Sequence, residues 1–233
     1  MENTAPFSDH VEELKKRSLA CLAVFSLLSA LSWFISDKVL SLASRPVGQL
    51  VFFAPAEAFL AKFKISLLVG AVLSSPVFLY NFWRYVSPAL LEKERVYGWL
   101  LPASYVLMLL GMAFGFFLVW PVGIRFLLSF RGENLKAMMS IGEYLGFLFY
   151  FLIAFGVVFQ MPLAILFLSL TGIVSANFLA AQRKYAILII FILAAVLTPG
   201  PDVFSQLMLA SPMILFFEAG IIISRMAERG RAG

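Results

Sequence analysis

The residues best suited to binding chemistry lie in one short polar stretch between two long apolar runs. Residues 85–95 read Tyr-Val-Ser-Pro-Ala-Leu-Leu-Glu-Lys-Glu-Arg, so two carboxylates and two cations fill the last four positions. Glu92 and Glu94 could accept paired hydrogen bonds from guanidinium groups, whose planar donors match a carboxylate. The same charges also suit a solvated loop that sets membrane topology. These residues alone leave both interpretations open.

A second charged stretch comes just before the first apolar run. Asp9 followed by Glu12 three residues later is typical of a helix start with a capping box. Glu12 and Lys16, like Glu13 and Arg17, stand four residues apart, the spacing of ion pairs on one helix face. A solvated helix that neutralises its own charge and a helix whose polar face binds a partner both fit this pattern.

Catalysis in a membrane needs a base, a nucleophile or a metal site, and the sequence offers no recognisable set. The only histidine, His10, precedes the first apolar run, and the only cysteine, Cys21, lies within it. The HExxH, CxxC and glycine-rich phosphate-loop motifs are absent. A single cysteine also excludes an intramolecular disulfide. We therefore expect no enzymatic activity, no metal site and no cofactor.

Polar residues at membrane depth form a smaller set of candidates. Gln160 and Glu218 lie inside apolar runs, and Thr198 and Gln206 flank the turn Pro199-Gly-Pro-Asp202. An isolated glutamine in a membrane helix commonly hydrogen-bonds within its own bundle. A carboxylate costs more to bury, so Glu218 is the stronger candidate for a functional role.

These residues must be positioned by membrane-spanning helices. The chain of 233 residues is 62% hydrophobic and 13% charged, whereas soluble domains carry about 25% charged residues. This composition indicates a polytopic membrane protein. The net charge of +5 fits lysines and arginines at cytoplasmic membrane edges. It does not indicate nucleic-acid binding, because that would need a basic face on a soluble domain.

Apolar runs predict an all-α integral membrane protein of six transmembrane helices in a single domain, residues 1–233. The predicted spans are about 18–36, 65–86, 97–120, 144–170, 185–198 and 205–223. The fifth and sixth are the short ones: the 14 residues of the fifth, at about 1.5 Å each, reach about 21 Å, less than the roughly 30 Å of bilayer hydrocarbon. The first run is longer than the apolar region of a signal peptide, so we interpret it as a retained span.

The distribution of basic residues predicts the orientation of these spans. If the N-terminus is inside, 11 lysines and arginines fall on the cytoplasmic side and seven on the other. The bias favours both termini in the cytoplasm.

Prolines indicate where helices end or bend. In the long outer loop from Asp37 to Lys64, Pro46 and Pro55 act as breakers, and Glu57 belongs to a short capped helix that re-enters toward the second span. Pro76 and Pro162 lie inside spans and should kink them, because proline cannot donate the helical hydrogen bond.

Gly111-Met-Ala-Phe-Gly115 is a small-residue pattern inside an apolar run, and it predicts close helix packing.

Several strings together resemble the TatC family, the polytopic subunit of the twin-arginine protein translocase. The resemblance covers about residues 7–225. The strings, in chain order, are His10-Val-Glu-Glu-Leu-Lys-Lys-Arg17, Pro55-x-Glu57-x-Phe59, Tyr85-Val-Ser-Pro88-Ala-Leu-x-x-x-Glu94-Arg95, Phe155-Gly-x-x-Phe159-Gln-x-Pro162 and Leu197-Thr-Pro-Gly-Pro-Asp202-x-Phe204-Ser-Gln206.

The resemblance implies a curved, cupped bundle with both termini in the cytoplasm. It also implies a multi-pass protein of an energy-coupling inner membrane, bacterial or of archaeal or plastid type. Such a protein recognises signal peptides with consecutive arginines and recruits TatB- and TatA-type single-span partners. Folded proteins then cross the bilayer using the proton-motive force. Further copies of the same chain are expected in the complex.

The resemblance also assigns roles to individual residues. It implies signal-peptide binding by Glu13, Lys15, Tyr85 and Glu94, to which the charge pattern adds Glu12 and Glu92. Contact with TatA or TatB is implied for Gln160, Thr198 and Gln206. Structural roles fall to Pro46, Glu57, Pro76 and Asp202.

Two positions depart from the family pattern, and one rival function stays open. Gln160 stands where the family usually has Glu, so a proton relay there is not expected, whereas contact with a partner helix is. The turn from Thr198 to Asp202 carries one extra Gly. The alternative is a proton- or ion-coupled transporter of a small solute, with Glu218 and Gln160 near its site. Polar residues gather at the cytoplasmic edge rather than at the bilayer midplane, which favours a receptor.

Overall fold

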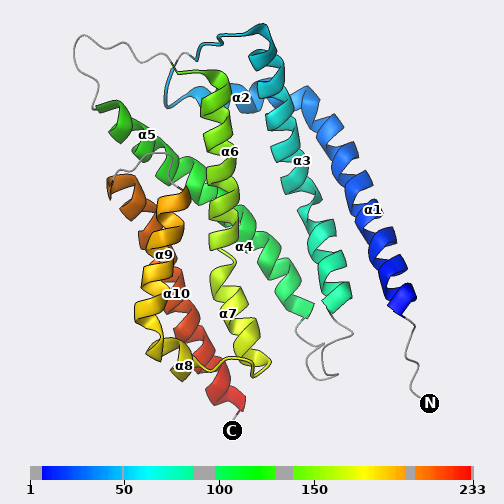
Figure 1. The fold of residues 1–233 in the computed structure, drawn as a ribbon, viewed down its shortest axis with the longest axis vertical. Coiled ribbons are helices and arrows are strands. Elements are labelled where there is room, and N and C mark those ends of the chain that lie inside the picture. The colour runs from blue at the N-terminus through cyan, green and yellow to red at the C-terminus, as the bar shows by residue number, and fades with distance from the viewer. Residues whose placement is uncertain (1–6, 49, 87–97, 130–138, 198–202, 232–233) are drawn as a thin grey trace. The chain divides into compact units, whose positions relative to one another are not determined.

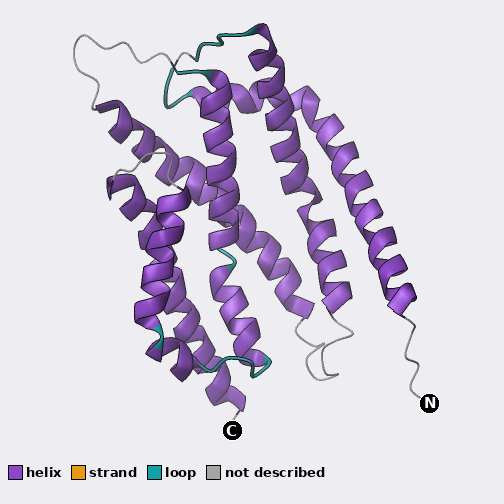
Figure 2. Cartoon of the chain, viewed as in Figure 1, coloured by secondary structure: helices purple, strands orange, loops and turns teal. Residues whose placement is uncertain are grey.

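The computed structural model describes residues 7–48, 50–86, 98–129, 139–197 and 203–231. In this part of the chain, helices are joined by loops and turns (Figure 2). One isolated parallel β-bridge joins Val51 and Ser140. The chain divides into two compact units. The first unit comprises Met1–Ala43 and Ala54–Tyr105, and the second comprises Ser44–Phe53 and Val106–Gly233.

The first unit is built on two long antiparallel helices, α1 and α3, which lie side by side (Figure 1). A Cβ built on Gly70 of α3 would lie 2.7 Å from the Cα of Ser29 on α1, so the α3 backbone packs directly against Ser29. The elements are α1 (Phe7–Ser32), the 3₁₀ turn η1 (Trp33–Ile35), α2 (Ser36–Ser44) and α3 (Pro55–Val86).

Two serine–proline pairs explain how long helices tolerate an internal proline. Pro76 in α3 cannot donate to the carbonyl of Val72, and the hydroxyl of Ser75 donates to that oxygen instead, at 2.6 Å. In α10, Ser211 Oγ lies 3.5 Å from Met208 O, the carbonyl that Pro212 leaves without its helical donor. Both helices therefore continue past their prolines.

The second unit contains the remaining helices. They are α4 (Leu100–Phe114), whose first six residues belong to the first unit, the π-helical turn η4 (Gly115–Val119), α5 (Trp120–Ser129), α6 (Ile141–Val158), α7 (Met161–Leu170), α8 (Ala176–Ala181), α9 (Arg183–Leu197) and α10 (Val203–Arg231). α10 packs against α7 and α9. Pro162 separates α6 from α7, as the sequence predicted.

The core of this unit is aromatic. Trp120 is 2% exposed, and its indole N–H donates to the hydroxyl of Tyr144 at 2.9 Å. The Trp120 ring also packs against Phe147 and Phe151. The polar tip of each large ring is therefore satisfied inside an apolar interior.

The predicted spans are recovered with different ends. Five described stretches are long and apolar enough to cross a membrane: Lys15–Ser44, Pro55–Arg84, Leu100–Ser129, Ile141–Leu170 and Gln206–Glu228. α9 has only 15 residues, as predicted for the fifth span. The sixth was predicted to be short, and this was wrong: α10 has 29 residues. Its charged end stays helical because Arg and Glu are good helix formers.

Two local predictions also need correction. Pro55–Phe59 is not a separate re-entrant helix but the first turn of α3, because Pro at the first helical position does not interrupt the helix. Asp9 was predicted to cap the first helix, but α1 is already helical at Phe7.

Candidate functional site

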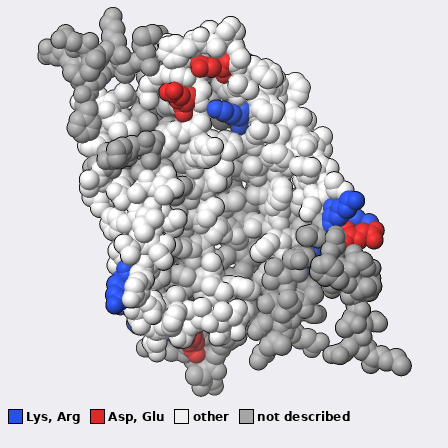
Figure 3. Space-filling view, in the orientation of Figure 1, with Lys and Arg blue, Asp and Glu red and all other residues white. Residues whose placement is uncertain are grey.

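The start of α1 and the end of α3 meet at one end of the first unit because the two helices are antiparallel. Glu12 pairs with Lys16 at 2.8 Å, as predicted, and both side chains are exposed. Blue and red atoms lie together at this end of α1 in the space-filling view (Figure 3). Lys15 is exposed. The helix pair thus presents an exposed charged surface that includes the Glu12 carboxylate.

Other predicted binding residues are placed only by their position along the chain. Glu13 lies on α1 and Tyr85 on the last turn of α3, and their side chains are outside the described set. Glu92 and Glu94 belong to residues 87–97, which the structure does not describe. The geometry therefore brings together the helix positions of Glu12, Glu13, Lys15 and Tyr85.

The polar residues at membrane depth have partners within the second unit. The Gln206 side chain donates from Nε2 to the carbonyl of Phe191 at 3.0 Å, which joins α10 to α9. Gln160 is half-buried at the turn between α6 and α7, and its backbone carbonyl accepts from the N–H of Ala164. Thr198 and Asp202 lie outside the described residues.

Glu218 has a specific cation partner that the sequence did not reveal. Arg183 donates from Nε to Oε1 at 2.7 Å and from Nη2 to Oε2 at 2.8 Å. This two-pronged geometry is the strong form of an Arg–carboxylate contact. The start of α9 is therefore fastened to the middle of α10. The sequence feature that could have indicated this ion pair is Arg183 itself, which stands just before the fifth apolar run.

A second polar cluster, also missed from the sequence, fastens the connection between α7 and α8. Ser224 Oγ donates to Ser169 Oγ at 2.5 Å, and Ser169 Oγ lies 3.1 Å from Glu228 Oε1. The same Glu228 oxygen accepts the N–H of Ala176 at 2.8 Å, at the start of α8. Both serines are buried, and these hydrogen bonds give each hydroxyl a partner inside the bundle.

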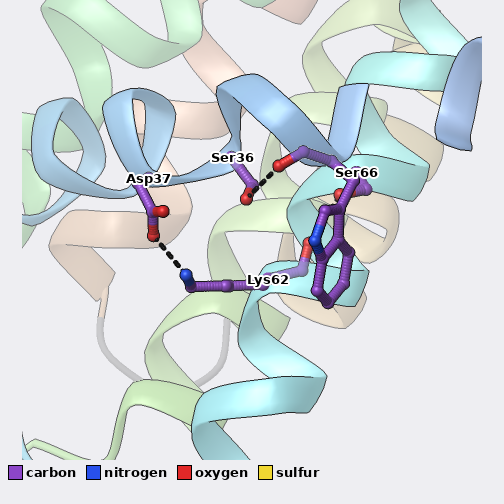
Figure 4. Close-up of polar contacts among 5 residues, drawn as sticks. Ser36, Asp37, Lys62 and Ser66 are labelled. Atoms are coloured by element: carbon purple, nitrogen blue, oxygen red, sulfur yellow. Dashed lines mark hydrogen bonds and ion pairs between the residues drawn. The ribbon is translucent and has the colours of Figure 1, made fainter. Parts of the chain in front are cut away.

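At the opposite end of the α1–α3 pair, Asp37 on α2 pairs with Lys62 on α3 at 2.7 Å (Figure 4). Nearby, Ser36 Oγ donates to the Trp33 carbonyl at 2.7 Å. Pro46 lies in the turn after α2, and the N–H of Glu57 donates to Ala54 O at the start of α3. Among the described residues, no group of three or more His, Cys, Asp and Glu side chains could hold a metal ion.

These features define a class first: a polytopic helical membrane protein with an exposed charged surface at the start of α1. The model of the TatC family, described as the Sec-independent protein translocase protein, matches residues 9–212. The chain therefore belongs to the TatC family, the core subunits of the Sec-independent translocase, and is a multi-pass protein of the inner membrane.

Individual relatives agree across nearly the whole chain. The TatC protein of Carboxydothermus hydrogenoformans is 38% identical over 225 residues, covering 94% of this chain and 93% of the relative. That of Desulforapulum autotrophicum is 38% identical over 235 residues, covering 97% and 86%. A crystal structure of the twin-arginine translocase receptor TatC superposes with a TM-score of 0.80 at 32% identity, covering 94% of this chain and 99% of the other.

Proposed function

We propose that this chain is the receptor that binds twin-arginine signal peptides at the cytoplasmic face of the translocase. The antiparallel pairing of α1 and α3 carries this proposal, because it brings the start of α1 and the end of α3 to the same end of the unit. Every residue assigned to signal-peptide binding lies on these two helix ends or on the connection that follows α3. The related solved structure is also described as a translocase receptor.

The chemistry of paired arginines suits this surface. Each guanidinium offers planar donors that a carboxylate can accept at two points. Glu94 and Glu92 on the connection, with Glu12 and Glu13 on α1, supply carboxylates for two adjacent arginines. A lysine in the peptide keeps the charge but loses the two-point geometry, so Arg→Lys peptides should bind more weakly.

Replacement of Glu94 tests the proposal directly. Glu94→Ala is expected to abolish crosslinking of a photoreactive twin-arginine peptide, because one arginine loses its carboxylate, while membrane insertion stays normal. Glu143→Ala is the matched control, since Glu143 is an exposed acid in the first turn of α6. Undiminished crosslinking to Glu94→Ala would refute the role of this residue.

We propose further that α9 and α10 receive the single-span TatB- and TatA-type partners, with Gln206, Thr198 and Gln160 as polar contacts. The support is a run of exposed apolar side chains along α9, which offers a surface to another transmembrane helix. They are Leu188, Ile189, Ile192 and Val196. Gln206 lies next to this helix through its bond to Phe191.

Gln206→Leu should reduce co-purification of the single-span partners several-fold, because a polar contact in lipid is lost. Gln206 also satisfies the Phe191 carbonyl, so the Tm of the purified variant must be measured beside co-purification. Gln182→Leu, outside α9 and α10, is the control. If co-purification persists with the Gln206 variant, the partner surface lies elsewhere.

We propose further that transport is driven by the proton-motive force and that the chain assembles with further copies of itself. We also propose that both units act together as one transmembrane domain. Family membership supports these three points.

A further inference from the structure

A groove of about 410 Å³ opens between α1 and α3 in the first unit. The structure places it on the same helix pair that carries the proposed arginine site. Its walls are Arg17, Ser18, Cys21 and Leu22 from α1, and Phe78, Asn81 and Phe82 from α3. None of the residues to which the family resemblance assigns a role lines this groove.

The groove changes in polarity along its length. Arg17, Ser18 and Asn81 lie toward the start of α1 and the end of α3, where they bring polar groups to the groove beside the exposed ring of Phe82. Leu22 and Phe78 lie deeper along the two helices and make the other end apolar. A ligand that fits this groove is therefore charged or polar at one end and apolar at the other.

Helix register places the polar end beside the proposed arginine site. Glu13 precedes Arg17 by four residues on α1, and Tyr85 follows Asn81 by four residues on α3. Residues four apart on a helix are neighbours on one face, one turn along. Two residues assigned to signal-peptide binding thus lie one turn beyond the groove, one on each wall.

We propose that this groove binds the apolar residues that follow the paired arginines in a signal peptide. The inference rests on the proposed function. A signal peptide passes from a positively charged region to an apolar one. With its arginines at the carboxylates, the chain that follows enters the groove at its polar end and places apolar side chains against Leu22 and Phe78. Burial of these side chains adds binding free energy that the arginine contacts alone do not supply.

Filling the groove tests the proposal. Ser18 is exposed on the groove wall, so Ser18→Trp blocks the mouth without disturbing a buried contact. We expect the affinity of the purified chain for a fluorescent twin-arginine signal peptide to fall at least ten-fold. Leu19→Trp is the control, because Leu19 is the next residue on α1 and does not line the groove. Its affinity should stay within two-fold of the unchanged chain.

A second pair of variants removes apolar surface instead of adding bulk. Leu19 and Leu22 are both 56% exposed on α1, but only Leu22 lines the groove. Leu22→Ser should weaken peptide binding three-fold or more, and Leu19→Ser should not. This matched pair keeps the test decisive if Ser18→Trp fails to fold.

Two altered peptides separate failure of the inference from failure of the proposed function. A peptide with lysines for both arginines should bind weakly to every variant. If the unchanged chain does not prefer arginines, the proposed function itself is refuted. A peptide with intact arginines but serines in place of its apolar residues should bind weakly to the unchanged chain, and no more weakly to Ser18→Trp. If arginine preference holds while Ser18→Trp and Leu22→Ser bind normally, the groove holds something else, such as a lipid chain, and the inference is overturned.

Discussion

Single residues show how charge is accommodated in this apolar protein. An isolated carboxylate inside a membrane helix is costly, and Glu218 avoids that cost by accepting hydrogen bonds from Nε and Nη2 of Arg183. Both side chains are more than a third exposed, so the net stabilisation is modest. The pair is better understood as a fastening between α9 and α10 than as a transport site.

Removing one partner of the Arg183–Glu218 pair should therefore lower the stability of the protein more than removing both partners. Arg183→Leu leaves Glu218 without its cation and should lower the free energy of unfolding by about 1 kcal/mol, a Tm decrease of a few degrees. The double variant with Glu218→Leu should recover most of this loss, because no unpaired charge remains. Thermal unfolding in detergent measures both.

The control for this experiment is Lys184→Leu, which removes a neighbouring cation that lies over the Tyr185 ring. It should change the Tm less than Arg183→Leu. Equal effects of the two variants would show that general charge, and not the paired contact, stabilises this region.

Helix elements are held together by small residues as much as by large ones. A Cβ on Gly111 would lie 2.6 Å from the carbonyl oxygen of Phe155, and one on Gly115 would lie 2.9 Å from the Phe155 ring. The backbones of α4 and α6 therefore pack in close contact, which confirms the packing role predicted for the two glycines. Close approach of this kind is a main source of helix association in lipid.

Alanine substitutions should rank according to what the new methyl group meets. Gly111→Ala should destabilise the fold by about 1–3 kcal/mol, because a backbone carbonyl cannot move aside. Gly156→Ala should cost less, since its Cβ would meet the flexible end of Met112 at 3.1 Å. Gly123→Ala is the control, with no atom within 4 Å. Thermal unfolding of the three variants gives the order, and a Gly111→Ala protein as stable as Gly123→Ala would contradict the packing argument.

At the scale of the whole molecule, the sequence predicted the positions of the membrane helices well. The first four and the sixth predicted spans overlap described stretches that are long and apolar enough to cross a membrane, and the fifth overlaps the shorter α9. Apolar runs are local signals, and so is Pro162, the proline at the start of α7. Helix ends were predicted less well, because charged residues such as Glu228 and Arg231 continue a helix beyond its apolar run. The short α9 was recognised because its apolar run is bounded by Arg183 and Pro199.

Contacts between helices could not be predicted from local patterns. Arg183 and Glu218 are 35 positions apart, and Ser169 and Ser224 are 55 apart. Only tertiary packing brings such pairs together, and a single sequence does not record it. For the candidate site, the family strings supplied the residue assignments, and the helix pairing supplied the reason that Tyr85 lies at the same end of the unit as Glu13.

The β-bridge between Val51 and Ser140 has a consequence for the order of events during synthesis. The N–H of Val51 donates to Met139 O, and its carbonyl accepts from Ile141 N–H. About 90 residues separate the two partners, so at 5–20 residues per second the second partner is made roughly 4 to 18 seconds after the first. Until then water must satisfy the backbone of Val51. The bridge can therefore form only after the chain between its two partners, with α3, α4 and α5, has been synthesised.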